Sequence, residues 1–247
     1  MLHLQLQQLR TRVVDDLCAA MEFKAFTHLA YNMAAEHCNC ATAGSGVTLG
    51  YTEFAHMLGL PDKTIPTGEL AGHFTCALEG PFLSLVHQHQ VVIFESGFFD
   101  LLQILLTDQP LRLPGKRQIE YSVVVAARSK EEIIASLVDR ELNELKYKSV
   151  TDWFLYLNRL VSECRISEDD AGKIAEAKAT RDLLVHNAGV VNDIYLQKAG
   201  KHARFTLGQA VSVTGHYTRD VWQTMASVLT GTIDTLLRVM PVKPADA

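Results

Sequence analysis

The first part of the chain carries the feature that most restricts its fold. Residues 4–36 contain neither proline nor glycine, so nothing in this stretch interrupts a helix. Its apolar residues recur at spacings of three and four: Leu6, Leu9, Val13, Leu17 and Met21. That period predicts a long helix with one apolar face, which other helices must cover. Residues 41–46, ATAGSG, then predict a flexible loop.

Three serine signatures predict further helices toward the C-terminus. In each, an acidic residue follows a serine by three positions: Ser129 with Glu132, Ser149 with Asp152, and Ser167 with Asp170. The hydroxyl can accept a hydrogen bond from a free backbone N–H at a helix start, and the acid faces the positive end of the dipole. These signatures predict helices over about 130–146, 150–164 and 168–187. A last helix is expected over about 214–240, ended by Pro241 and Pro244.

The middle of the chain is less regular. Residues 48–80 predict short helical pieces between glycines and prolines, and Pro81 is expected to start the helix or helices that run to Leu106. Residues 107–117 predict an irregular connection. The stretch IEYSVVVAA, from Ile119, is locally strand-like, although a short extended segment or a helix entry would have the same pattern.

Together these patterns predict an all-α protein, a helical bundle that is most regular between residues 82 and 240. We divide the chain into residues 1–80, residues 81–240, which form the bundle, and a flexible tail, residues 241–247. Residues 1–80 are either an accessory helical region or extra helices packed on the same core, and the sequence leaves both open.

Composition restricts the cellular setting and the partners. Hydrophobic residues make up 48% of the 247 residues, enough for a substantial core, and no uninterrupted apolar run reaches the length of a membrane-spanning helix. Five cysteines in a chain of this size favour reduced thiols, and the N-terminus lacks a secretory pattern, so we expect a cytoplasmic protein without a membrane partner. The net charge of −5 argues against a general nucleic-acid coat protein but permits an RNA enzyme with a small basic cleft.

The stretch ATRDLLVHNAGVVNDIYL, residues 179–196, carries the candidate chemistry. It ends the helix that begins at Ser167, and Gly189 suits a left-handed helix stop. Asp182 and His186 are four residues apart on one face, so the carboxylate can orient the imidazole, whereas Arg181 lies about 140° around the helix from His186. An imidazole, with a free pKa of about 6.5, can take a proton from an RNA 2′-hydroxyl or protonate a leaving oxygen, and a guanidinium can bind phosphate.

This motif resembles the signature of HEPN-superfamily ribonucleases, an arginine, a polar residue, three more residues and a histidine. The trailing HNAGVV and NDIYL also resemble many bacterial members. Aspartate stands at Asp182 where asparagine is frequent. Ala188 stands where a tyrosine marks members that are regulated by nucleotidylation, so that mode is not expected here.

The resemblance implies a four- or five-helix bundle, with additional N-terminal helices in this chain, that forms a homodimer with a composite RNase site. Arg181, His186 and Asp182 would then be the catalytic residues, and no metal or cofactor would be needed. The expected RNA contacts are Asn187, Lys198, Lys201 and Arg204. Cleavage would leave a 2′,3′-cyclic phosphate. Such proteins commonly act as toxins, in anti-phage defence or in RNA processing, so an antitoxin or regulatory protein is a possible partner.

Several other interpretations stay open at the level of sequence. A HEPN-like bundle without catalysis would bind RNA or a protein through the same groove. A third hypothesis is a zinc-stabilised domain, because one region is rich in candidate ligands: His37, Cys38, Cys40, His73 and Cys76. Buried thiols and satisfied histidines explain these residues better, since their spacing is not that of a common zinc motif.

Two further groups have ordinary structural explanations. The aromatic stripe Trp153, Phe154 and Tyr156 is typical of a core or dimer interface. His87 and His89 are two apart, and side chains two apart diverge on a helix, so a joint metal site is not expected.

Overall fold

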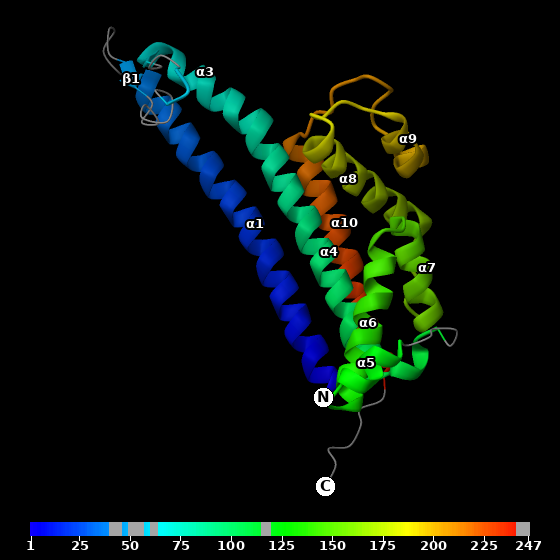
Figure 1. Cartoon of the computed structure of the whole chain (residues 1–247). Coiled ribbons are helices and arrows are strands. Elements are labelled where there is room, and N and C mark those ends of the chain that lie inside the picture. Colours follow the sequence, from blue (N-terminus) through cyan, green and yellow to red (C-terminus); the bar gives the residue numbers. More distant parts are fainter. Residues whose placement is uncertain (40–45, 49–56, 60–63, 115–119, 241–247) are drawn as a thin grey trace.

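The computed structural model describes residues 1–39, 46–48, 57–59, 64–114 and 120–240 (Figure 1). Helices dominate this part of the chain, so the all-α prediction is confirmed. The long helices are α1 (Leu2–Asn39), α4 (Leu83–Asp108), α6 (Lys130–Lys146), α8 (Glu168–His186) and α10 (Gly215–Val239). Shorter ones are α3 (Thr67–Ala77), α5 (Tyr121–Ala126), α7 (Val150–Leu160) and α9 (Asp193–Ala199). Strands β1 (Gly46–Thr48) and β2 (Thr64–Pro66) pair antiparallel, with Val47 opposite Ile65.

The predicted N-terminal helix is present as α1, which runs without a break for 38 residues. It lies antiparallel to α4, and α10 packs against both (Figure 1). Four of the five apolar positions predicted from the period are buried, with the exposed fraction of Leu6 at 0% and that of Val13 at 1%, and the fifth, Met21, is half-buried. The three- and four-residue spacing therefore correctly predicted which side of α1 faces the bundle.

One core unites the two ends of the chain. A single cluster of buried side chains contains Leu6 from α1, Leu102 from α4, Trp153 from α7 and Leu229 from α10. The sequence left open whether residues 1–80 form an accessory region or pack on the same core. The helix α1 packs on the same core. Residues 40–45 and the proposed tail, 241–247, lie outside the part of the chain that the structure describes.

Pro81 does not begin a helix, contrary to the expectation from the sequence. It lies inside a π-helical turn, Leu78–Phe82, which connects α3 directly to α4. A proline lacks the N–H of the helical ladder, and the wider turn accommodates the position where that bond is missing. The result is one continuous helical run, Thr67–Asp108, which is long and apolar enough to span a membrane. In the most apolar 18-residue stretch of this run, 61% is buried inside the protein, so the run packs as the core helix of a soluble protein does.

The serine caps set the helix starts as predicted. Ser149 Oγ accepts from Asp152 N–H at 3.1 Å, while the Asp152 carboxylate accepts from Ser149 N–H at 3.2 Å, which completes a capping box. Ser167 Oγ accepts from Asp170 N–H at 3.0 Å, and Ser129 caps α6 in the same way. The predicted helix over 150–164 is shorter than expected, because α7 ends at Leu160. The strand-like stretch after Ile119 is helical from Tyr121 to Ala126.

Candidate functional site

The C-terminal end of α8 is shaped by two consecutive left-handed residues. Ala188 has a φ of 49° and Gly189 a φ of 73°, and the Gly189 N–H donates to the Leu183 carbonyl at 2.9 Å. The predicted glycine stop is therefore confirmed, although the turn begins one residue earlier, at Ala188. Beyond it the chain pairs with residues 208–211, where Val211 N–H donates to Gly189 O at 2.8 Å. This pairing holds the end of α8 in one position.

A surface hollow of about 370 Å³ lies between the end of α8 and α9. Four of the residues predicted for the site line it: Asp182, His186, Asn187 and Lys198. Asn192, Ile194 and Tyr195 from the start of α9 and Ala179 and Leu183 of α8 also line it. The Asn192 side chain accepts from Tyr195 N–H at 3.0 Å and so fixes the start of α9 beside the hollow.

His186 is exposed and is the last residue of α8. Within the described chain its imidazole makes no hydrogen bond or ion pair with another side chain or with the backbone. The orientation by Asp182 that the i, i+4 spacing suggested is thus not formed. The imidazole is free to exchange a proton with a molecule that enters the hollow.

Asp182 instead lies among cations. Its carboxylate is 3.1 Å from Arg181 Nη1, 3.1 Å from Lys198 Nζ and 3.8 Å from Lys178 Nζ. These cations occupy the carboxylate that the i, i+4 spacing offered to the imidazole, and such charge-assisted contacts are strong ones. The aspartate therefore balances positive charge beside the hollow.

Arg181 faces away from His186, as its place on the helix predicts. Its Nη2 is paired with the carboxylate of Glu95 on α4, which also lies 2.7 Å from Lys178 Nζ. The side chains of Arg181 and Glu95 are 19% and 20% exposed, so the pair is shielded from most of the solvent. Three cations thus meet two carboxylates here, and Arg181 does not line the hollow.

The remaining predicted RNA contacts lie in different places. Asn187 lines the hollow, but its amide also donates to Val190 O at 2.5 Å and so helps to shape the turn. Lys198 bridges α9 to Asp182 at the edge of the hollow. Lys201 is exposed in the turn after α9 and does not line the hollow, and Arg204 lies in a separate polar cluster.

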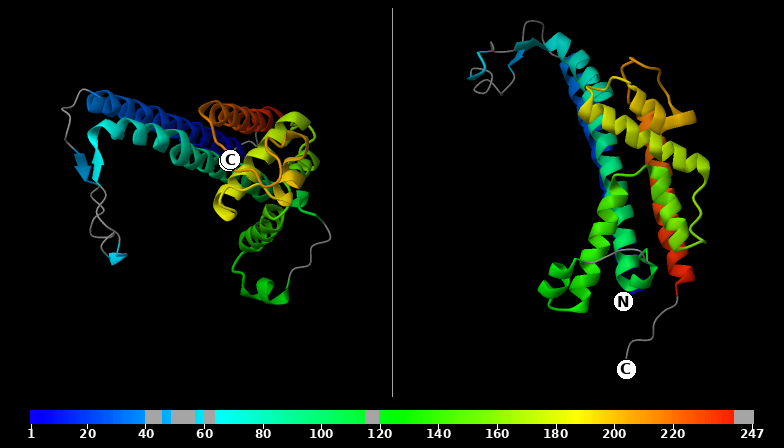
Figure 2. Two further views of the ribbon diagram at one scale, coloured as in Figure 1. Left: turned by 90° about the horizontal axis from the view of Figure 1, so that it is seen from above. Right: turned by 45° about the vertical axis from the view of Figure 1, so that its right-hand side comes forward.

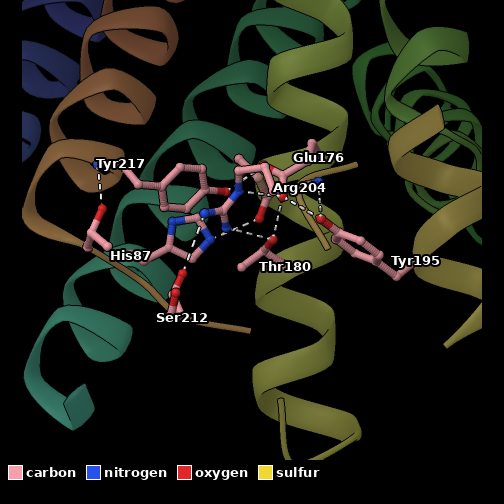
Figure 3. Close-up of polar contacts among 9 residues, drawn as sticks. His87, Glu176, Thr180, Tyr195, Arg204, Ser212 and Tyr217 are labelled. Carbon is pink, nitrogen blue, oxygen red and sulfur yellow. Dashed lines mark hydrogen bonds and ion pairs between the residues drawn. The ribbon is translucent and has the colours of Figure 1, made fainter. Parts of the chain in front are cut away.

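That polar cluster is centred on the buried carboxylate of Glu176 in α8 (Figure 3). Glu176 accepts hydrogen bonds from Thr180 Oγ1 at 2.8 Å and from the hydroxyls of Tyr195 at 2.8 Å and Tyr217 at 2.7 Å. Arg204 Nε donates to the same carboxylate at 2.9 Å, and its guanidinium lies 3.3 Å from the ring centroid of Tyr217. The cluster joins α8, α9, the segment after α9 and α10, so it has the geometry of a structural tie.

Burial changes the acid–base properties of the residues around Glu176. Burial raises the pKa of Tyr195 to about 12 and that of Tyr217 well above its ordinary value, and the nearby Glu176 carboxylate adds to both shifts. Burial also lowers the pKa of His87 to about 4. His87 Nε2 donates to the Ala177 carbonyl at 2.9 Å, while its Nδ1 is buried and has no hydrogen-bond partner in the part of the chain that the structure describes. Both tyrosines and His87 are therefore neutral near pH 7.

Sequence reasoning missed Glu95, Glu176 and His87 as members of these clusters. Glu95 did carry a signal, since it is a charged residue inside the apolar stretch of α4, and such residues are rarely buried without a partner. Glu176 and His87 gave no comparable signal. Their partners, such as Arg204 and Ala177, are brought near only by the packing of α4, α8 and α10.

Packing accounts for the aromatic stripe and for His87. Trp153 and Tyr156 are buried in the core, and Trp153 Nε1 donates to Leu145 O at 2.8 Å. His87 is buried and His89 exposed, so the two diverge as predicted. Among the residues that the structure describes, no group of three or more His, Cys, Asp and Glu side chains is placed to hold a metal ion. Cys40 of the zinc hypothesis lies outside them. The expected burial of the other candidate ligands is wrong: Cys38 is half-buried, and His37, His73 and Cys76 are exposed.

Comparison of the chain with protein-family models, with curated proteins and with solved structures gave no match.

Proposed function

We propose that this protein is a cytoplasmic, metal-independent endoribonuclease of the HEPN type, with its site around His186. The observation that carries the proposal is the position of His186, an exposed imidazole that shares a hollow of about 370 Å³ with Lys198 and Asn187 and has no partner among the described residues. An imidazole that is free to transfer protons beside a cation and an amide suits RNA phosphodiester cleavage.

In the proposed reaction, one histidine removes the proton of the 2′-hydroxyl, and the 2′-oxygen attacks the adjacent phosphorus. The bond from phosphorus to the 5′-oxygen breaks, and a second histidine protonates that oxygen. The products are a 2′,3′-cyclic phosphate and a 5′-hydroxyl end, so atoms and charge balance without a metal. Lys198 would stabilise the phosphorane charge, and Arg181 would do so once it is released from Glu95.

A second copy of the chain would supply the second histidine. Exposed apolar residues lie near His186 in the chain: Val185 on α8, Val190 in the following turn, and Ile194 on α9, which lines the same hollow. Apolar residues that gather around a polar centre are typical of an interface between subunits. This arrangement supports a homodimer in which two His186 residues face a shared cleft. A nuclease of this kind would need an inhibitor, such as an antitoxin, or a trigger from phage infection.

The test is cleavage of total RNA and tRNA by the purified protein in EDTA. We expect cleavage by the wild type and by His89→Ala, a matched control that removes an exposed histidine from α4. His186→Ala should lower the rate by at least roughly 100-fold, the typical contribution of a positioned acid or base. Cleavage by His186→Ala at the wild-type rate, or intact RNA with every protein, would refute the proposal.

One observation favours a second candidate, an RNA- or protein-binding module without catalysis. Arg181 is held by Glu95 and Asp182, so in the single chain its guanidinium is not directed at the hollow. For such a module, RNA would be bound but left intact. His186→Ala would then change the dissociation constant by less than about threefold, whereas Lys198→Ala would weaken binding in a salt-dependent way.

A further inference from the structure

A two-helix arm extends from the bundle (Figures 1 and 2). It consists of the second half of α1 and the antiparallel α3, and β1 and β2 lie at its tip. Lys24 marks its base, since Lys24 Nζ donates to Thr218 Oγ1 at 2.7 Å near the start of α10. Beyond that point α1 packs on α3, where the rings of Tyr31 and Phe74 lie 5.3 Å apart. The opposite side of α1 faces away from α3.

That opposite side carries a row of large apolar side chains. Phe26 is 67% exposed, Leu29 56% and Met33 62%, and we call these three residues the outer stripe. On an ideal helix they lie within about 60° of one another, so they form one continuous apolar surface. Single exposed apolar residues are ordinary, but a contiguous row along one helix face marks an interaction surface.

The stripe is bounded at each end by a polar side chain in line with it. Glu22 precedes Phe26 by four residues, and His37 follows Met33 by four, and both are exposed. The order Glu22, Phe26, Leu29, Met33, His37 has the three- and four-residue spacing of a coiled-coil seam. It is also symmetric about the midpoint between Leu29 and Ala30.

This symmetry selects the partner. If a second α1 lies antiparallel with its dyad at that midpoint, Phe26 of one copy meets Met33 of the other. Glu22 then meets His37, whose imidazole N–H can donate to the carboxylate. A parallel pairing would place Glu22 against Glu22, which is unfavourable between like charges. Apolar contact, the hydrogen bond of Glu22 with His37 and the separation of the two Glu22 carboxylates thus all favour a second copy of this chain in the antiparallel orientation.

We propose that the outer stripe is a self-association surface, through which the arms of two copies pair antiparallel about a dyad between Leu29 and Ala30. This interface is separate from the one proposed around His186 and goes beyond it. A protein that uses both surfaces would form assemblies larger than a dimer.

Sedimentation velocity of the full chain tests the pairing. Phe26→Glu/Met33→Glu places two carboxylates in the stripe and should halve the mass of the assembly formed by the wild type, without lowering the thermal midpoint. Leu29→Glu and Leu155→Glu are a matched pair, because these leucines are 56% and 55% exposed on helices. The first should raise the dissociation constant of the arms roughly tenfold or more and the second should leave it unchanged. Equal masses for all of these proteins would overturn the proposal.

Disulfide trapping tests the orientation. When Phe26→Cys protein is mixed with Met33→Cys protein under mild oxidation, we expect a cross-link between positions 26 and 33, identified by peptide mass. Cross-links only between like positions would overturn the antiparallel arrangement.

A membrane surface is the competing occupant of the outer stripe, and binding to vesicles of a neutral phospholipid tests it. The proposal would be refuted if the wild type floated with the vesicles, if Phe26→Glu/Met33→Glu abolished that flotation, and if the arms did not associate in solution. The outer stripe would then bind lipid and not a second copy of the chain.

Discussion

The side chain of Arg204 donates from Nε to the buried carboxylate of Glu176 at 2.9 Å, which ties the segment after α9 to the middle of α8. A further bond from Arg204 N–H to the Tyr195 hydroxyl, at 3.0 Å, strengthens this tie. Arg204 was a predicted RNA contact, but its guanidinium is already engaged by Glu176 and lies over Tyr217. Its first role is therefore to hold α9 and the wall of the hollow in place.

Arg204→Ala should destabilise the fold, because it leaves the buried Glu176 without its counter-ion. Breaking a buried pair from one side typically costs about 3 to 5 kcal/mol, and the 27% exposure of the Arg204 side chain lowers our expectation to about 2 kcal/mol. Lys201→Ala, in the exposed turn nearby, should change stability by less than about 0.5 kcal/mol. Urea unfolding of the two variants measures the difference. Equal stabilities would show that Glu176 does not need the guanidinium.

Glu95→Gln should release Arg181, since it removes the carboxylate that holds Nη2 on the α4 side. Under the proposed function, the freed guanidinium reaches phosphate more often, and kcat/KM for RNA cleavage should rise about tenfold, which corresponds to about 1.4 kcal/mol. Stability should fall at the same time, because Lys178 loses its contact with Glu95. Glu79→Gln, an exposed carboxylate outside the cluster, is the control. A fall in kcat/KM would mean that the pair of Arg181 with Glu95 supports the site as it stands.

The ends of the helices could be predicted wherever interactions between residues close in the sequence determine them. Ser129, Ser149 and Ser167 each satisfy a free N–H at a helix start, and this interaction requires only residues three positions apart. The end of α8 followed from a glycine for the same reason. Pro81 misled the prediction because a proline at a helix start and a proline in a π-helical turn look alike in sequence.

The site could be predicted only in part, because some of its residues are neighbours in the sequence and others are brought together by long-range packing. Asp182, His186 and Asn187 lie on one short segment, and all three line the same hollow. The long-range partner of Arg181 is Glu95, 86 positions away, and no local pattern links the two. An i, i+4 spacing made a contact of Asp182 with His186 possible, but long-range packing supplied Lys198 as the stronger partner.

Gly97→Ala should destabilise the bundle at the place where α1, α4 and α10 meet. A Cβ added to Gly97 would lie 2.7 Å from Leu229 Cδ2 and 2.9 Å from Val13 Cγ2, closer than such contacts allow. Overpacking costs typically about 1 to 3 kcal/mol, which exceeds the gain of about 1 kcal/mol in helix propensity. Gly231→Ala on α10, where a Cβ meets open space, should instead stabilise the protein by about 0.5 to 1 kcal/mol. Opposite shifts of the thermal midpoint for the two variants would confirm this.

His87 should make the protein sensitive to acid. Its pKa is about 4 in the folded protein because of burial, whereas a free histidine has a pKa of about 6.5, so the unfolded chain binds the proton more tightly. The free energy of unfolding is therefore unaffected by this group above pH 6.5 and falls as the pH drops from about 6.5 to about 4. Between pH 7.5 and pH 4.5 this loss amounts to about 2 to 3 kcal/mol.

His87→Phe should remove that part of the pH dependence, since phenylalanine does not titrate and keeps a ring beside Tyr217. At pH 7.5 the variant should be less stable by about 1 kcal/mol, because the hydrogen bond to the Ala177 carbonyl is lost. At pH 4.5 it should be more stable than the wild type. Urea unfolding at both pH values measures this reversal in the order of stability of the wild type and the variant. His89→Phe is the control for the loss of an exposed histidine. Parallel losses in the wild type and His87→Phe would show that His87 is not the group that destabilises the folded state in acid.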